Sequence, residues 1–105
     1  MEKAHIDIPK ERIAEFCKKW RIREFALFGS VLRDDFRSDS DIDVLATFDE
    51  GAGHTLFDMV HMEEELEAIF ERGVDLVSRR GLESSQNYIR KNAILSTAST
   101  VYEER

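Results

Sequence analysis

FALFGSVLRDDFRSDSDIDVLATF, residues 25–48, is the stretch that decides the fold of this chain. An apolar run stands at each end, and Gly29-Ser30 and the pair Asp41 and Asp43 lie between them. A short apolar run stopped by a glycine is typical of a buried strand, and Ser30 is a favourable cap for a short helix. The stretch therefore predicts a strand, a tight turn, a short helix, a loop and a second strand that begins with two carboxylates.

The second strand follows from strict alternation, since side chains two apart on a strand share a face. One face is expected to carry Ile42, Val44, Ala46 and Phe48, and the other Asp41, Asp43, Leu45 and Thr47. Both aspartates therefore point the same way.

Regular elements are also expected before and after this stretch. An apolar stripe of Ile13, Phe16, Cys17 and Trp20 predicts a helix over Pro9–Lys19, and Arg23–Phe28 is expected to form the first strand. Thr55 is predicted to cap a helix over Leu56–Glu71 that Gly73 closes. The inward side chains of that helix are expected to be Leu56, Met59, Val60, Leu66, Ile69 and Phe70.

The last third of the chain contains one more apolar run interrupted by an acid. Val74–Ser78 is predicted to be a strand with Asp75 on the face opposite Val74 and Leu76. A final helical region is expected to begin at Ser84 or Ser85 and to run through Leu95, with a weak end in the Ser/Thr-rich residues 96–100.

Three carboxylates in strands need an explanation, because a buried carboxylate costs free energy. Asp41 and Asp43 can offer oxygens to one ion, and Asp75 completes the cluster if its strand lies beside theirs. Mg²⁺ prefers carboxylates combined with phosphates and water, and two such ions suit three acids. Asp-x-Asp alone is weak support for a metal site, and turn or capping roles explain Asp39 but not Asp43.

Gly29 and Ser30 supply the other half of a nucleotide site. Glycine lets a phosphate approach the backbone closely, and the free N–H groups at a helix N-terminus attract anions. A metal and a helix terminus would then hold one triphosphate between them, and phosphoryl chemistry depends mainly on such positioning and on charge neutralisation. The Arg79-Arg80 pair is interpreted either as a phosphate contact or as a solvated pair.

Length and composition limit the number of domains and the kinds of partner that this chain can have. The 105 residues are expected to form a single domain, 1–105, of a cytoplasmic protein, with no membrane span and no signal-type stretch. Cys17 is the only cysteine and is assigned to the core, so no disulfide can form within the chain. A formal net charge of −7 argues against direct nucleic-acid binding and favours a divalent cation or a basic protein partner. The Glu63-Glu64-Glu65 run is interpreted as a solvated helix face, or less readily as a contact for such a partner.

Gly29-Ser30, ten further residues and Asp41-Ile42-Asp43 resemble the G-S-x10-D-x-D signature of the polymerase-β-like nucleotidyltransferase superfamily. The chain is similar to its minimal stand-alone members, the minimal nucleotidyltransferase (MNT) antitoxins that pair with HEPN toxins. Residues 38–44 are similar to the metal-binding stretch of that family and residues 73–77 to its third-carboxylate strand. Residues 88–95 resemble its closing helix more loosely.

The resemblance implies a fold, a set of roles and an activity. The fold is α/β (α+β), with a small mixed sheet of three or four strands flanked by helices. Gly29 and Ser30 would hold nucleotide phosphates, and Arg33 stands where the family often places an arginine. The metal-binding and catalytic carboxylates would be Asp41, Asp43 and Asp75, the last as ligand or general base. Many relatives read Gly-Ser-x-Ala-Arg-Gly, from which this chain departs at residues 32 and 34.

The expected activity is Mg²⁺-dependent transfer of AMP from ATP to a tyrosine hydroxyl of a cognate HEPN ribonuclease toxin, which would neutralise that toxin. A minimal core leaves few residues for an acceptor pocket, so the acceptor is expected to be a docking protein. Two alternatives remain at this point. The chain could be a non-catalytic antitoxin that acts by occlusion, or it could transfer a nucleotide to the hydroxyl of a small molecule.

Overall fold

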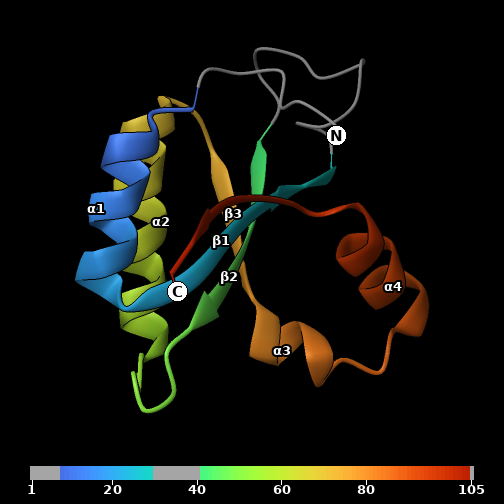
Figure 1. Cartoon of the computed structure of the whole chain (residues 1–105). Coiled ribbons are helices and arrows are strands. Elements are labelled where there is room, and N and C mark those ends of the chain that lie inside the picture. The colour runs from blue at the N-terminus through green and yellow to red at the C-terminus, as the bar shows by residue number, and fades with distance from the viewer. Residues whose placement is uncertain (1–7, 30–40, 105) are drawn as a thin grey trace.

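A four-stranded mixed sheet forms the centre of the computed structural model, which describes residues 8–29 and 41–104 (Figure 1). Its strands, in spatial order, are β3 (Val74–Ser78), β2 (Ile42–Phe48), β1 (Ile22–Phe28) and β4 (Ser99–Glu103). β1 is antiparallel to β2 and β4, whereas β2 and β3 are parallel. The predicted fold class, a small mixed sheet flanked by helices, is confirmed.

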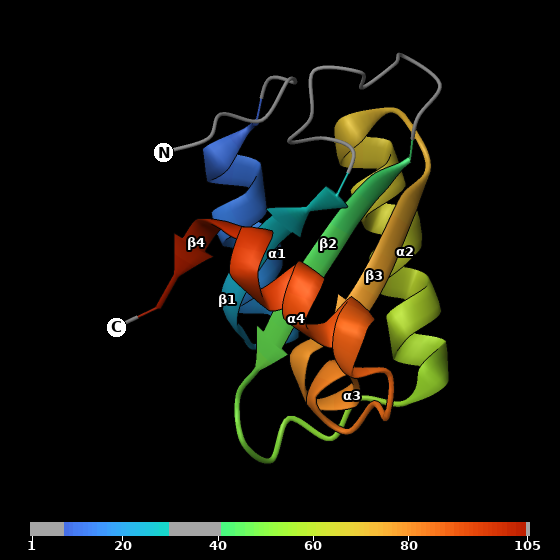
Figure 2. The ribbon, with the colours of Figure 1, turned by 90° about the vertical axis from the view of Figure 1, so that its right-hand side faces the viewer.

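Helices cover both faces of this sheet, as the two views in Figures 1 and 2 show. α1 (Lys10–Trp20) and α2 (Leu56–Phe70) lie on one face, and α3 (Arg79–Glu83) and α4 (Tyr88–Thr97) lie on the other. The larger part of the core lies under the first pair and contains Ile13, Phe16, Phe25, Val44, Met62 and Leu66, among others. The smaller part lies under the second pair and contains Ala26, Phe28, Leu45, Leu82 and Ile94. β2 therefore contributes buried side chains to both parts of the core, and successive residues alternate between the two faces as its sequence predicts.

The start of α2 agrees with its prediction, but part of its inward face does not. The Thr55 side chain accepts a hydrogen bond from the Asp58 N–H at 3.3 Å, and the Asp58 carboxylate accepts one from the Thr55 N–H at 3.0 Å. Leu56 and Val60 were expected to face inward, but they are 84% and 50% exposed. Met62 takes their place in the core, because the sheet contacts the helix along a stripe that also contains Met59, Leu66, Ile69 and Phe70.

The end of α2 also differs from the expectation that Gly73 closes it. The helix ends at Phe70, and Glu71 adopts the left-handed conformation with φ 57°. Gly73 stands two residues later, where its carbonyl oxygen accepts a hydrogen bond from the Ile42 N–H at 2.9 Å. It belongs to the entry into β3 rather than to the helix cap.

The C-terminal third contains two helices and a strand where one helical region was predicted. The cap of α4 is Asn87, whose side chain accepts a hydrogen bond from the Arg90 N–H at 3.1 Å, and not Ser84 or Ser85. Those serines lie between the two helices. β4 was not predicted, although Thr100, Val101 and Tyr102 are residue types that favour strands. No helix within residues 8–29 and 41–104 is long and apolar enough to cross a bilayer.

Candidate active site

The parallel pairing of β2 and β3 brings two of the predicted acids together. Asp43 is the register partner of Asp75, and neighbouring strands lie about 4.8 Å apart. Asp41 stands two residues before Asp43, immediately ahead of β2, and is exposed like Asp75, while Asp43 is half-buried. The expectation that the third acid lies on a strand beside the second is therefore confirmed.

Two glycines stand against the first two aspartates. A Cβ atom at Gly29 would overlap the Asp43 carboxylate, and a Cβ atom at Gly73 would overlap the Asp41 carboxylate. Gly29 follows Phe28, the register partner of Asp43, and has φ 74°, a conformation that glycine adopts readily. The missing side chains thus leave room for both carboxylates at this end of the sheet.

The donor set fits a divalent cation in its chemistry. Carboxylate oxygens from adjacent strands are the ligands that Mg²⁺ prefers, and the two glycines carry no side chain that would overlap them. Among residues 8–29 and 41–104, no three His, Cys, Asp or Glu side chains are placed as a closed ligand set. Ser30 and Arg33, the predicted phosphate contacts that follow Gly29, lie outside the described residues, as do Asp39 and the short helix predicted after Ser30.

α2 holds the strand that carries Asp75. Glu63 accepts a hydrogen bond from the Leu76 N–H at 3.0 Å, and Glu67 accepts one from the Val74 N–H at 3.3 Å. The interpretation of residues 63–65 as a solvated face is therefore wrong for Glu63. Periodicity in the sequence gives no signal for these contacts, because a glutamate at either position also fits a solvated helix face.

The profile of the nucleotidyltransferase domain family matches residues 10–98, which include both acid-bearing strands and the four helices of the described residues. The chain belongs to that family. It is a nucleotidyltransferase.

Two relatives of this nucleotidyltransferase carry the name of a protein adenylyltransferase. Protein adenylyltransferase MntA of Thermococcus cleftensis is 37% identical over 70 residues, which are 67% of this chain and 69% of MntA. A protein of Methanocaldococcus jannaschii assigned as a protein adenylyltransferase is 31% identical over 74 residues, which are 70% of this chain and 72% of that protein.

Solved structures share the fold of the nucleotidyltransferase. One that carries the name minimal nucleotidyltransferase is 33% identical, with a TM-score of 0.65 over 86% of each chain. A toxin-antitoxin structure with AMP-PNP has a TM-score of 0.71 at 16% identity, over 93% of this chain and 76% of that one. A Shewanella oneidensis MNT antitoxin complex with a tri-AMPylated HEPN toxin has a TM-score of 0.61 at 17% identity, over 90% and 69% of the two chains.

Arg79 and Arg80 of the nucleotidyltransferase lie away from the three aspartates, beyond the far end of β3. Arg79 is 3.5 Å from Glu24 and 3.7 Å from Glu83, and Arg80 is exposed. Both arginines line a cavity of about 600 Å³, and Thr47 lines it as well. The Thr47 hydroxyl is buried without a hydrogen-bond partner. Arg79 is thus held by carboxylates at this end of the sheet.

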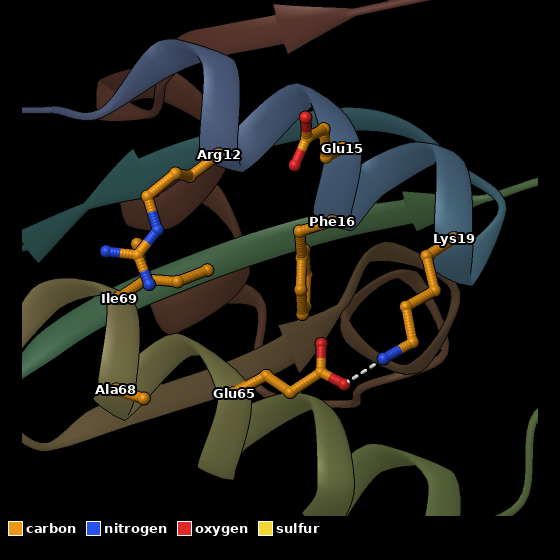
Figure 3. A pocket seen from close by; sticks show the side chains of 7 residues that line it. All are labelled: Arg12, Glu15, Phe16, Lys19, Glu65, Ala68 and Ile69. Atoms are coloured by element: carbon orange, nitrogen blue, oxygen red, sulfur yellow. Dashed lines mark hydrogen bonds and ion pairs between the residues drawn. The ribbon is translucent and has the colours of Figure 1, made fainter.

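A smaller cavity of about 320 Å³ lies between α1 and α2, on the face of the sheet that these two helices cover (Figure 3). Across it, Glu65 accepts hydrogen bonds from the Lys19 ammonium and, at 3.0 Å, from the Trp20 indole N–H. Burial alone would raise the pKa of Glu65, but these hydrogen bonds and the positive charge of Lys19 lower it overall. Glu65 therefore joins the two helices and is not part of a free acidic face.

Proposed function

We propose that this nucleotidyltransferase transfers AMP from ATP to a tyrosine hydroxyl of a partner protein of the HEPN toxin type. The observation that carries the proposal is the register of β2 and β3, which sets Asp43 beside Asp75 with Asp41 two residues away. The names of the related proteins support a protein as the acceptor, and AMP-PNP in a structural neighbour supports an adenine nucleotide as the donor.

The proposed reaction exchanges a phosphoanhydride bond of ATP for a phosphodiester bond to the acceptor. The acceptor oxygen attacks the α-phosphorus of ATP, the bond from that phosphorus to the bridging oxygen breaks, and pyrophosphate leaves. The hydroxyl proton passes to a base, for which Asp75 is the candidate if it does not serve as a third ligand.

The other site residues are assigned to binding. Asp41 and Asp43 would hold Mg²⁺, and Gly29, Ser30 and Arg33 would face the phosphates. When bound, Mg²⁺, as one or two ions, neutralises the charge that develops on the phosphate oxygens. The residues of the chain orient the nucleotide for in-line attack.

Charge and exposed apolar surface support a protein acceptor. The net charge of −7 favours a basic partner, such as a ribonuclease that binds RNA. Leu56, Phe57, Val60, Tyr88 and Ile89 are large apolar side chains that are at least half exposed. These exposed side chains on α2 and α4 also favour a second candidate function, in which the chain neutralises a toxin by binding alone.

Label transfer separates the two functions. The chain is incubated with ATP labelled at the α-phosphate, Mg²⁺ and the protein encoded beside it, and the double variant Asp41→Asn with Asp43→Asn is assayed in parallel. Asp49→Asn, which removes one carboxylate charge just after the other end of β2, is the control for loss of charge away from the site. Label on a tyrosine of the partner that is lost only in the double variant supports catalysis. No transfer at all, with full neutralisation by the double variant, supports occlusion and contradicts the proposal.

A further inference from the structure

β3 is the edge strand of the sheet on the side of α2, and it carries Asp75. An edge strand exposes every second N–H group, because alternate residues point their backbone groups away from the neighbouring strand. Here the two N–H groups on either side of Asp75 donate to Glu63 and Glu67 of α2, at 3.0 and 3.3 Å.

The spacing of the two glutamates matches that of the two N–H groups. Residues four apart on a helix share a face and are about 6 Å apart along its axis. Residues two apart on a strand are about 6.6 Å apart. Glu67 meets Val74 and Glu63 meets Leu76, so the helix and the strand run in opposite directions along this contact.

Asp75 itself is held from the other side. The Gly73 carbonyl oxygen accepts a hydrogen bond from the Ile42 N–H of β2 at 2.9 Å, and the backbone groups of Asp75, two residues on, point the same way. The peptide units that flank Asp75 are therefore fixed by β2 on one side and by the two glutamates on the other.

We propose that Glu63 and Glu67 are positioning residues that set the Asp75 carboxylate relative to Asp43. This inference rests on the proposed role of Asp75 in nucleotidyl transfer. Two more negative charges near an acidic site add repulsion, so the glutamates contribute backbone geometry and not charge. A glutamine, which keeps an acceptor oxygen at the same reach, should therefore replace either glutamate.

The test compares four proteins: the wild type, the pair Glu63→Ala with Glu67→Ala, the pair Glu63→Gln with Glu67→Gln, and Glu64→Ala. Glu64 is an exposed acid between the two glutamates and serves as the matched control. One measurement is amide hydrogen exchange by NMR, which requires no metal or partner. The other is label transfer from ATP to the partner as a function of Mg²⁺ concentration.

In the alanine pair, the Val74 and Leu76 amides should exchange faster, while the Ile42 amide stays protected. The kcat should fall about tenfold to a hundredfold and the Mg²⁺ concentration for half-maximal rate should rise, as for lost outer-shell partners of metal ligands. The KM for ATP should stay close to that of the wild type. The glutamine pair and Glu64→Ala should stay close to the wild type in every measurement.

Wild-type kcat and Mg²⁺ dependence in the alanine pair would overturn the inference and leave the proposed function intact. An equal loss in the glutamine pair would overturn it too, since charge would then be the contribution. If the alanine pair does not fold, the single variants Glu63→Ala and Glu67→Ala carry the same test. No label transfer by the wild type would contradict the proposed function. Independently of activity, unchanged hydrogen exchange of the Val74 and Leu76 amides in the alanine pair would contradict the positioning role.

Discussion

Gly73→Ala separates the stability of this protein from its activity. A Cβ atom at position 73 would overlap Asp41 Oδ1 and stand 3.0 Å from Asp41 Cγ, closer than two such atoms normally approach. The backbone can accept alanine, because Gly73 is not in the left-handed region that Gly29 occupies. The obstacle is the end of a flexible side chain, so the Asp41 carboxylate is expected to turn away.

The two effects should differ greatly in size. Relief of the overlap requires the carboxylate to move by about 1 Å, and a misplacement of that size can cost about a hundredfold in rate. That loss corresponds to about 2.7 kcal/mol of transition-state stabilisation. The free energy of unfolding should change by only about 1 kcal/mol or less, because alanine also restricts the unfolded chain and so offsets part of the cost.

The measurements are kcat/KM for label transfer and urea unfolding of the same preparations. Gly81→Ala is the matched control, because its new Cβ atom would approach only the Ser78 hydroxyl, at 2.9 Å. Gly29→Ala should lose both activity and stability, since its φ of 74° adds about 1–2 kcal/mol of backbone strain. Wild-type kcat/KM in Gly73→Ala, or a loss of several kcal/mol in its stability, would refute the reasoning.

Four further predictions concern the fold. Leu66→Ala should destabilise the protein by about 2–5 kcal/mol because Leu66 is fully buried. Leu56→Ala should change stability by less than about 0.5 kcal/mol because Leu56 is exposed. Equal losses of stability for the two variants in chemical denaturation would contradict the described buried face of α2. Burial raises the pKa of the Cys17 thiol to about 12, so iodoacetamide should label it at pH 8 only in denaturant, as mass spectrometry can check. Thr55→Ala should cost about 1 kcal/mol in urea unfolding through the lost cap. The hydrogen bond from the Thr55 N–H lowers the pKa of Asp58 below its usual 3.8. The stabilisation from the ionised Asp58 should therefore be complete above pH 3.8 and decline as the pH falls through the folded-state pKa. Unfolding of Asp58→Asn and of the wild type, compared over pH 2–6, would reveal this loss.

The elements that carry the acids could be predicted from the sequence because their patterns are local. Alternation assigns Leu45 to the face opposite Val44, and the structure buries both, under different helices. The apolar run around Asp75 predicts β3 in the same way. That Asp43 pairs with Asp75 required one further assumption, that the two strands are neighbours, which the parallel register confirms.

What could not be predicted depends on contacts between distant segments. The sequence of α2 is apolar on more than one side, so only its contact with the sheet determines that Met62 is buried and Leu56 exposed. β4 lies in a Ser/Thr-rich run with little alternation and gains its order from pairing with β1. The contact of Glu63 with β3 is likewise invisible to periodicity, since a glutamate at that position fits a solvated face equally well.

The short connection between α2 and β3 has a consequence for insertions and deletions. Only residues 71–73 separate the two elements, and both Glu67 and Asp41 depend on where that connection ends. One added residue there would shift β3 by one position and turn Asp75 to the opposite face of the sheet. Residues 49–55, between β2 and α2, hold none of the three acids, and a longer surface loop there costs little chain entropy. Variation in length is therefore expected before α2 and not after it.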